Sequence, residues 1–178
     1  MMENVRPGGR DRWKIAVWAA AAGLWLTPLI AMRFTNEVVW DAFDFAVFGA
    51  MLLSVCGLLE LATRMSRSVF YRLGFALALV AGFVLIWMNL AVGIIGSEDN
   101  PTNLMYAGVL AIGAAGAVLA RLKPQGMAIA LVVMAVAQGL VSATAVLSGY
   151  FTVPLDAAFI AVWLLSAWLF HTAARQTM

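Results

Sequence analysis

Apolar residues run along this chain in six long blocks, and the short stretches between the blocks hold nearly all of the charge. A helix needs about 20 residues to cross about 30 Å of hydrocarbon, since each residue adds about 1.5 Å. The blocks that meet this length are residues 15–32, 44–64, 73–96, 104–120, 126–149 and 154–175. The pattern therefore predicts an all-α integral membrane protein with six transmembrane helices.

The sixth block is the weakest candidate for a span. Its charge-free core covers only residues 157–170, a length that also fits an interfacial or buried segment. Extending it to Pro154 and Arg175 gives a full span, provided that the polar end residues reach the interface. We count it as a span, with an interfacial helix as the alternative.

Composition supports lipid as the solvent for most of the chain. Of the 178 residues, 64% are hydrophobic and 11% are charged, whereas a soluble domain is about 45–50% apolar. The net charge is +2, but the basic residues lie in short loops and not on one face of a helix. This placement predicts membrane lipids as partners and no nucleic acid.

The distribution of lysine and arginine predicts the orientation. Cytoplasmic loops of membrane proteins carry an excess of these residues. In a six-span arrangement, Arg33 is the lone basic residue on one side, and the other side carries Arg6, Arg10, Arg12, Lys14, Arg64, Arg67, Arg72, Arg121, Lys123 and Arg175. This bias places both termini in the cytoplasm of a bacterial inner membrane.

With this orientation the spans form three consecutive hairpins, joined on the cytoplasmic side near residues 65–72 and 121–126. Similar openings at residues 76–80 and 128–132 leave two explanations, an ancestral repeat or the general rules of membrane hairpins. The predicted organisation is a basic N-terminal segment at 1–14, one transmembrane domain at 15–175, and a tail at 176–178.

Few polar side chains lie at bilayer depth, and each is a functional candidate because burying it in lipid is costly. Glu60 and Arg64 are four residues apart, so they share a helix face and predict a salt bridge; a proton-binding or substrate role for Glu60 is the alternative. Asn89, Gln138 and Ser142 are explained either by hydrogen bonds between helices or by a polar path through the bundle.

Acidic residues gather on the predicted outer side, at Glu37, Asp41, Asp44, Glu98, Asp99 and Asp156. If residues 37–44 are helical, the first three share one face. The set predicts either a cation-attracting mouth or docking face, or simply the charges left outside by the positive-inside bias. In the second case Asp44, Asn100 and Asp156 cap, or favour electrostatically, the positive amino ends of the second, fourth and sixth helices.

Catalytic and cofactor motifs are missing from the sequence. Cys56 is the single cysteine and His171 the single histidine, which excludes a bis-histidine haem and a multi-histidine or thiolate metal centre. The sequence has no GxSxG, no glycine-rich phosphate loop and no HExxH. We therefore expect no enzyme activity, no cofactor and no metal.

The segment WMNLAVGIIGSEDNP at residues 87–101, continued by TNLMY at 102–106, resembles uncharacterised small inner-membrane proteins of Gram-negative bacteria. This resemblance covers the third and fourth spans with their outer turn and implies no activity. The three-hairpin plan, with Pro101 and Pro154 in outer turns, is also similar to acid-resistance membrane proteins built from three two-helix repeats. Neither resemblance assigns a function to a particular residue of this chain.

These observations predict a non-enzymatic accessory, assembly or stress-related membrane component that acts through helix packing, as a homo-oligomer or with another membrane protein. The alternative is a small-solute or ion transporter whose polar path runs through Glu60, Asn89 and Gln138.

Overall fold

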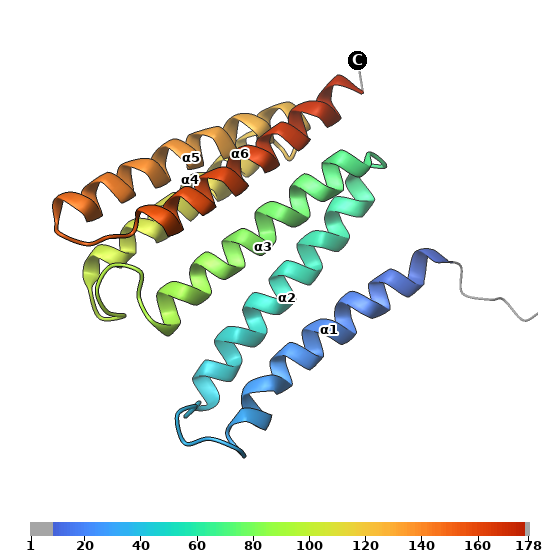
Figure 1. Ribbon diagram of the computed structural model, residues 1–178. Coiled ribbons are helices and arrows are strands. Elements are labelled where there is room, and N and C mark those ends of the chain that lie inside the picture. The colour runs from blue at the N-terminus through green and yellow to red at the C-terminus, as the bar shows by residue number, and fades with distance from the viewer. Residues whose placement is uncertain (1–8, 177–178) are drawn as a thin grey trace, which may run out of the picture. The chain divides into compact units, whose positions relative to one another are not determined.

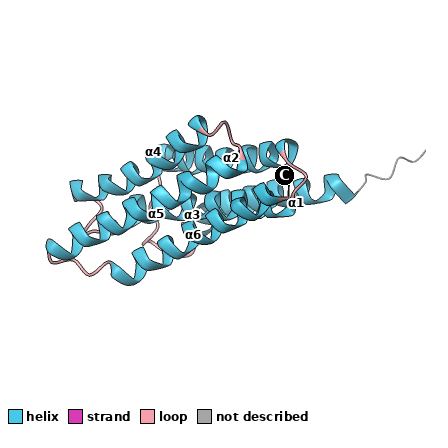
Figure 2. Cartoon of the chain, turned by 90° about the horizontal axis from the view of Figure 1, so that it is seen from above, coloured by secondary structure: helices cyan, strands magenta, loops and turns pink. Residues whose placement is uncertain are grey.

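The computed structural model describes residues 9–176, and these residues are helical with short connections (Figure 1). Figure 2 shows no strand in this part of the chain. The helices are α1 (Gly9–Ala31), α2 (Ala42–Met65), α3 (Val69–Ala91), the 3-10 turn η1 (Pro101–Asn103), α4 (Leu104–Leu119), α5 (Pro124–Leu147) and α6 (Val153–Arg175).

Six of these helices are long and apolar enough to cross a membrane, with the fourth span formed by η1 and α4 together. The predicted all-α membrane class is therefore confirmed, and the chain is a multi-pass membrane protein. The sixth block forms a helix of 23 residues, long enough for a full span. Most of the predicted basic N-terminal segment, residues 1–8, and the last two residues of the predicted tail lie outside the described residues.

The third block was predicted to remain helical through Gly96, and this boundary is wrong. α3 ends at Ala91, and residues 92–100 form a loop in which Gly93 and Gly96 have φ angles of +67° and +77°. Glycine adopts this left-handed region without strain. A side chain at Gly93 would also collide with the backbone of Ser97 and Glu98, so the loop depends on this glycine.

Local polar groups explain where two of the helices begin. Asp41 precedes α2, and its Oδ1 accepts hydrogen bonds from the backbone N–H groups of Phe43 and Asp44 at 2.7 and 3.0 Å. Asn100 precedes η1, and its Oδ1 accepts from the N–H of Thr102 at 3.0 Å, with Pro101 next to it. These bonds satisfy amide groups that have no partner within the helix. The prediction that Asn100 lies at the amino end of the fourth span is confirmed.

The chain divides within α2, after Leu61, into two compact units. In the first unit, Trp25 of α1 contacts α2: its Nε1–H donates to the carbonyl of Phe45 at 2.9 Å. The indole also meets the Phe45 ring edge to face, with centroids 5.6 Å apart. At another point Lys14 and Glu60 form a salt bridge of 3.0 Å. Thus α1 and α2 are joined by a few specific contacts.

In the second unit, α6 packs against α3 and α5, and α5 also packs against α4, whereas α3 and α4 share only a small contact. Small residues allow these close approaches, as they commonly do between membrane helices. A Cβ built on Gly74 of α3 would lie 3.2 Å from the carbonyl oxygen of Ser166 in α6. The Ser166 hydroxyl, fully buried, donates to the Gly74 carbonyl at 2.6 Å.

The turn between α4 and α5 is held by a side chain from α3. Arg121 and Leu122 have φ angles of +49° and +57°, which are unusual for residues with a side chain. The hydroxyl of Tyr71, a buried residue, donates to the Leu122 carbonyl at 2.9 Å. This hydrogen bond ties the strained turn to the core of the second unit.

Candidate functional site

Asp156 is the centre of a buried polar cluster in the second unit. It lies in the first turn of α6 and is 1% exposed. Its Oδ1 accepts a hydrogen bond from Gln138 Nε2 of α5 at 2.7 Å and another from the Tyr106 hydroxyl of α4 at 3.1 Å. One carboxyl oxygen therefore joins three helices.

The donors are as deeply buried as the carboxyl group, with Tyr106 1% and Gln138 0% exposed. Thr152, just before α6, is also buried. Within the described part of the chain, three oxygen atoms of this cluster lack a hydrogen-bond partner: Asp156 Oδ2, Gln138 Oε1 and Thr152 Oγ1. Such atoms are rare in native interiors because each costs free energy.

Asn103 organises the loop between α3 and α4 at the same end of α4 as Tyr106. Its Oδ1 accepts from the N–H groups of Ile94 and Ile95 at 3.1 and 2.8 Å. Its Nδ2 donates to the carbonyls of Ser97 at 2.7 Å and Ile95 at 3.4 Å. One buried side chain thereby replaces the backbone partners that the loop lacks.

The loop after α5 meets the loop held by Asn103. A Cβ built on Gly96 would lie 3.1 Å from the Tyr150 ring and 3.2 Å from Asn100 Nδ2. Two connections distant in sequence therefore touch at this end of the second unit. Thr152 follows in the chain immediately after this contact.

The prediction that Asp156 belongs to an acidic outer surface is wrong, because its side chain is turned into the helix bundle. The other five predicted members are exposed: Glu37, Asp41, Asp44, Glu98 and Asp99. Residues 37–41 are not helical, so the shared helix face of the first three is not formed. Asp41 and Asp44 instead bond to backbone amides at the start of α2.

The predicted intramembrane polar residues have different partners. Glu60 lies in the first unit and pairs with Lys14, a contact that the sequence did not predict; its pairing with Arg64 stays a prediction. Asn89 Nδ2 donates to the Leu85 carbonyl of its own helix at 2.8 Å. Gln138 joins Asp156 and Ser142 is half-buried.

Tyr106, Thr152 and Asn103 were not identified from the sequence. Thr152 and Asp156 do stand four residues apart, which places them on one face of a helix. Tyr106 carries no local signal, since its role depends on the packing of α4 against α5. In the sequence Asn103 looks like any other polar loop residue. Its role depends on the fold, which places residues 94–97 around its side chain.

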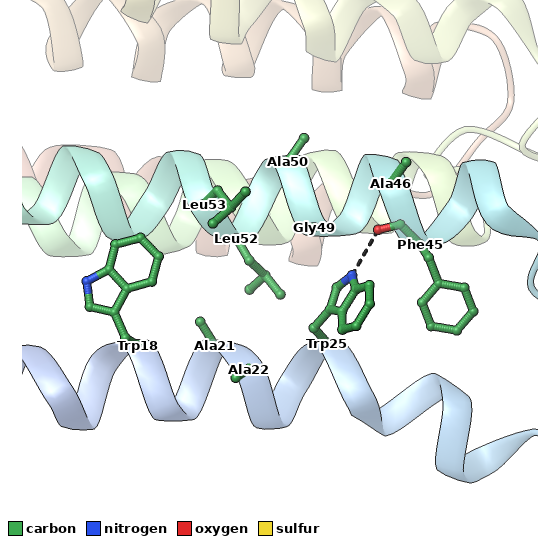
Figure 3. Close-up of a pocket in the computed structure, with 10 residues that line it drawn as sticks. All are labelled: Trp18, Ala21, Ala22, Trp25, Phe45, Ala46, Gly49, Ala50, Leu52 and Leu53. Carbon is green, nitrogen blue, oxygen red and sulfur yellow. Dashed lines mark hydrogen bonds between the residues drawn. The ribbon is translucent and has the colours of Figure 1, made fainter.

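An apolar groove lies between α1 and α2 in the first unit, with a volume of about 490 Å³. Figure 3 shows Trp18 and Trp25 of α1 extending toward α2 on either side of two alanines. The lining residues are Trp18, Ala21, Ala22, Trp25, Phe45, Ala46, Gly49, Ala50, Leu52 and Leu53. The groove thus combines small residues with two aromatic walls and has little polar character.

Comparisons with known proteins add no family to this description: no protein-family model, curated protein or solved structure matches the chain. Among the described residues, no three or more histidine, cysteine, aspartate or glutamate side chains are grouped to hold a metal ion. The buried cluster and the groove are therefore the two features of the structure that bear on function.

Proposed function

We propose that this chain is a non-enzymatic accessory, assembly or stress-related component of a bacterial inner membrane, acting through helix packing. The observation that carries the proposal is the enclosure of Gln138. This amide, in the middle of α5, is 0% exposed and bonded to Asp156 of α6. A polar group that closes a contact between helices stabilises the bundle, whereas a transport path needs polar groups that meet water.

The groove of the first unit supplies a surface for such packing. Alanines line it from both helices and Gly49 lines it from α2, and small residues let another transmembrane helix approach closely. The proposed occupant is a helix of a second copy of this chain or of another membrane protein.

The proposed topology is three consecutive hairpins with both termini in the cytoplasm. The support is the ten-to-one bias of basic residues between the two sides. Reporter fusions after Arg67, Lys123 and Arg175 are expected to be cytoplasmic, and fusions at Glu98 and Gly149 exterior. An activity reporter and a fluorescent reporter, read in parallel at each site, check this. A cytoplasmic signal at Gly149 would remove a span from the scheme.

The function is tested with purified protein in liposomes and in mild detergent. We expect no flux of protons, monovalent cations or small neutral solutes above that of protein-free vesicles, because Glu60, Asn89 and Gln138 each bond to a different partner and do not form a continuous path. We expect self-association in detergent, measured by mass, and its loss in Ala22→Trp, which fills the groove. Ala20→Trp is the matched control, since Ala20 is exposed but does not line the groove.

A transporter would give the opposite result. Flux that is abolished by Gln138→Leu or Asn89→Leu, in protein that still folds, would replace the packing proposal by the polar path through Glu60, Asn89 and Gln138. A monomeric protein with no groove-dependent association would also contradict the proposal.

A further inference from the structure

The cluster around Asp156 has a specific imbalance of donors and acceptors. Gln138 Nε2 donates to Asp156 Oδ1 at 2.7 Å, so one atom of the amide is joined to one atom of the carboxyl group. The second oxygen of each group, Gln138 Oε1 and Asp156 Oδ2, lacks a hydrogen-bond partner among the described residues. Both are acceptors when the carboxyl group is ionised. A single proton on one of these oxygens would form a hydrogen bond to the other, so both atoms would gain a partner.

We propose that Asp156 is a proton-binding site, with the proton on Oδ2 donated to Gln138 Oε1. The acid and the amide then form a cyclic pair with two antiparallel hydrogen bonds, of which the structure already contains one. The Tyr106 hydroxyl adds a third bond by donating to Oδ1 at 3.1 Å. The proton makes the carboxyl group neutral, whereas an ionised group at 1% exposure would be a charge held away from solvent.

No cationic side chain faces Asp156 from the elements packed around it in the described second unit. Tyr106 is the titratable residue of α4, and α5 contains none. On α6, His171 and Arg175 lie 15 and 19 residues further along, about 22 and 28 Å at 1.5 Å per residue.

The other titratable groups of this unit lie elsewhere. Arg64 and Arg67 lie at the end of α2 and just before α3, and Arg121 and Lys123 lie in the turn between α4 and α5. Tyr71 and Arg72 of α3 lie at the far end of α6, since the Tyr71 ring contacts Phe170 at 5.1 Å. Arg72 bonds to the carbonyls of Thr63 and Ser66. Glu98 and Asp99 are exposed on their loop and Tyr150 is 38% exposed. An ionised Asp156 would therefore be a buried charge without a counter-ion.

One local feature favours the ionised form. Asp156 lies in the first turn of α6, where the helix dipole attracts negative charge. This attraction is weaker than the penalty for burying an unpaired carboxylate. A metal cation is a poorer fit than a proton, because the cluster offers three unpartnered oxygens, whereas a hard cation such as calcium takes about six or more oxygen ligands.

Infrared spectroscopy tests the proposal directly, on the full chain at neutral pH in a detergent without carbonyl groups. The difference spectrum of wild type minus Asp156→Asn should contain the C=O stretch of a protonated carboxylic acid. The double variant Asp156→Asn with Gln138→Glu moves the carboxyl group from α6 to α5. Its spectrum should again contain the C=O stretch of a protonated carboxylic acid. A carboxylate band in place of the acid band would overturn the proposal.

Proton release on unfolding provides an independent measurement. A free aspartate ionises near pH 3.9, so unfolding at neutral pH should release one more proton per chain from the wild type than from Asp156→Asn. The sign follows because the folded state holds more protons than the unfolded state, so raising the pH favours unfolding. Equal release from the two proteins would contradict the proposal.

The melting temperatures of two matched variants show whether Asp156 carries a proton, is ionised or binds a metal ion. Asp156→Asn keeps the acceptor and places an N–H where the proposed O–H lies, so its melting temperature should equal that of the wild type. Asp156→Ala removes all three hydrogen bonds, the two to Gln138 and the one from Tyr106, and should melt at a lower temperature. If sodium or potassium raises the melting temperature of the wild type but not that of Asp156→Asn, the site binds a metal cation and the proton-binding proposal is wrong. Marked destabilisation by Asp156→Asn would also count against it.

Discussion

Asn103→Ala is expected to lower the free energy of unfolding by about 3 kcal/mol or more, since it removes hydrogen bonds to four backbone groups. The amides of Ile94 and Ile95 and the carbonyls of Ile95 and Ser97 all bond to this one side chain. The loop has no regular structure of its own to supply replacements. The loss should therefore exceed that of an ordinary surface hydrogen bond.

Denaturant titration followed by tryptophan fluorescence measures this loss, and limited proteolysis reports on the loop itself. Cleavage near Glu98 and Asp99 should become faster in Asn103→Ala. Asn100→Ala is the matched control because the side chain of Asn100 accepts a single backbone hydrogen bond, from the N–H of Thr102; its expected cost is about 1 kcal/mol. Equal losses from the two variants would show that Asn103 does not organise the loop.

Gly116→Ala is expected to destabilise the second unit by about 2 kcal/mol through overpacking. A Cβ at Gly116 of α4 would lie 2.5 Å from Ala130 Cβ and 3.4 Å from Ala130 Cα of α5. Alanine has only one side-chain atom and no other rotamer to adopt, so α4 and α5 must move apart. The intrinsic helix preference of alanine over glycine, about 1 kcal/mol at most, offsets only part of this cost.

Two controls isolate the helix contact. Gly108 lies in the same helix, and a Cβ added there would have no neighbouring atom within 4 Å, so Gly108→Ala should leave stability unchanged or increase it slightly. Combining Gly116→Ala with Ala130→Gly moves the methyl group to the other helix and should recover much of the loss. An equal effect at Gly108, or no recovery in the double variant, would mean that the loss does not come from this contact.

The sequence by itself determined the membrane class and the number of spans. Both follow from the length of uncharged helix that hydrocarbon requires, a property of consecutive residues. Local motifs could also be predicted. Asn100 caps the start of the fourth span as predicted, because a capping side chain and its target amide lie within the same few residues. The third span was predicted too long because Val92, Ile94 and Ile95 continue the apolar pattern, and periodicity does not show that Gly93 turns the chain.

Only the tertiary structure decided what the polar residues do. Asp156 looked like an outer charge because it stands beside a loop, but packing of α6 against α5, which also packs against α4, turned it toward Gln138 and Tyr106. Glu60 had a cation four residues away in sequence, but the salt bridge that the structure shows for it joins it to Lys14, 46 positions away. A buried polar group must find its partner wherever the fold places one, and the sequence distance to that partner carries no information about it.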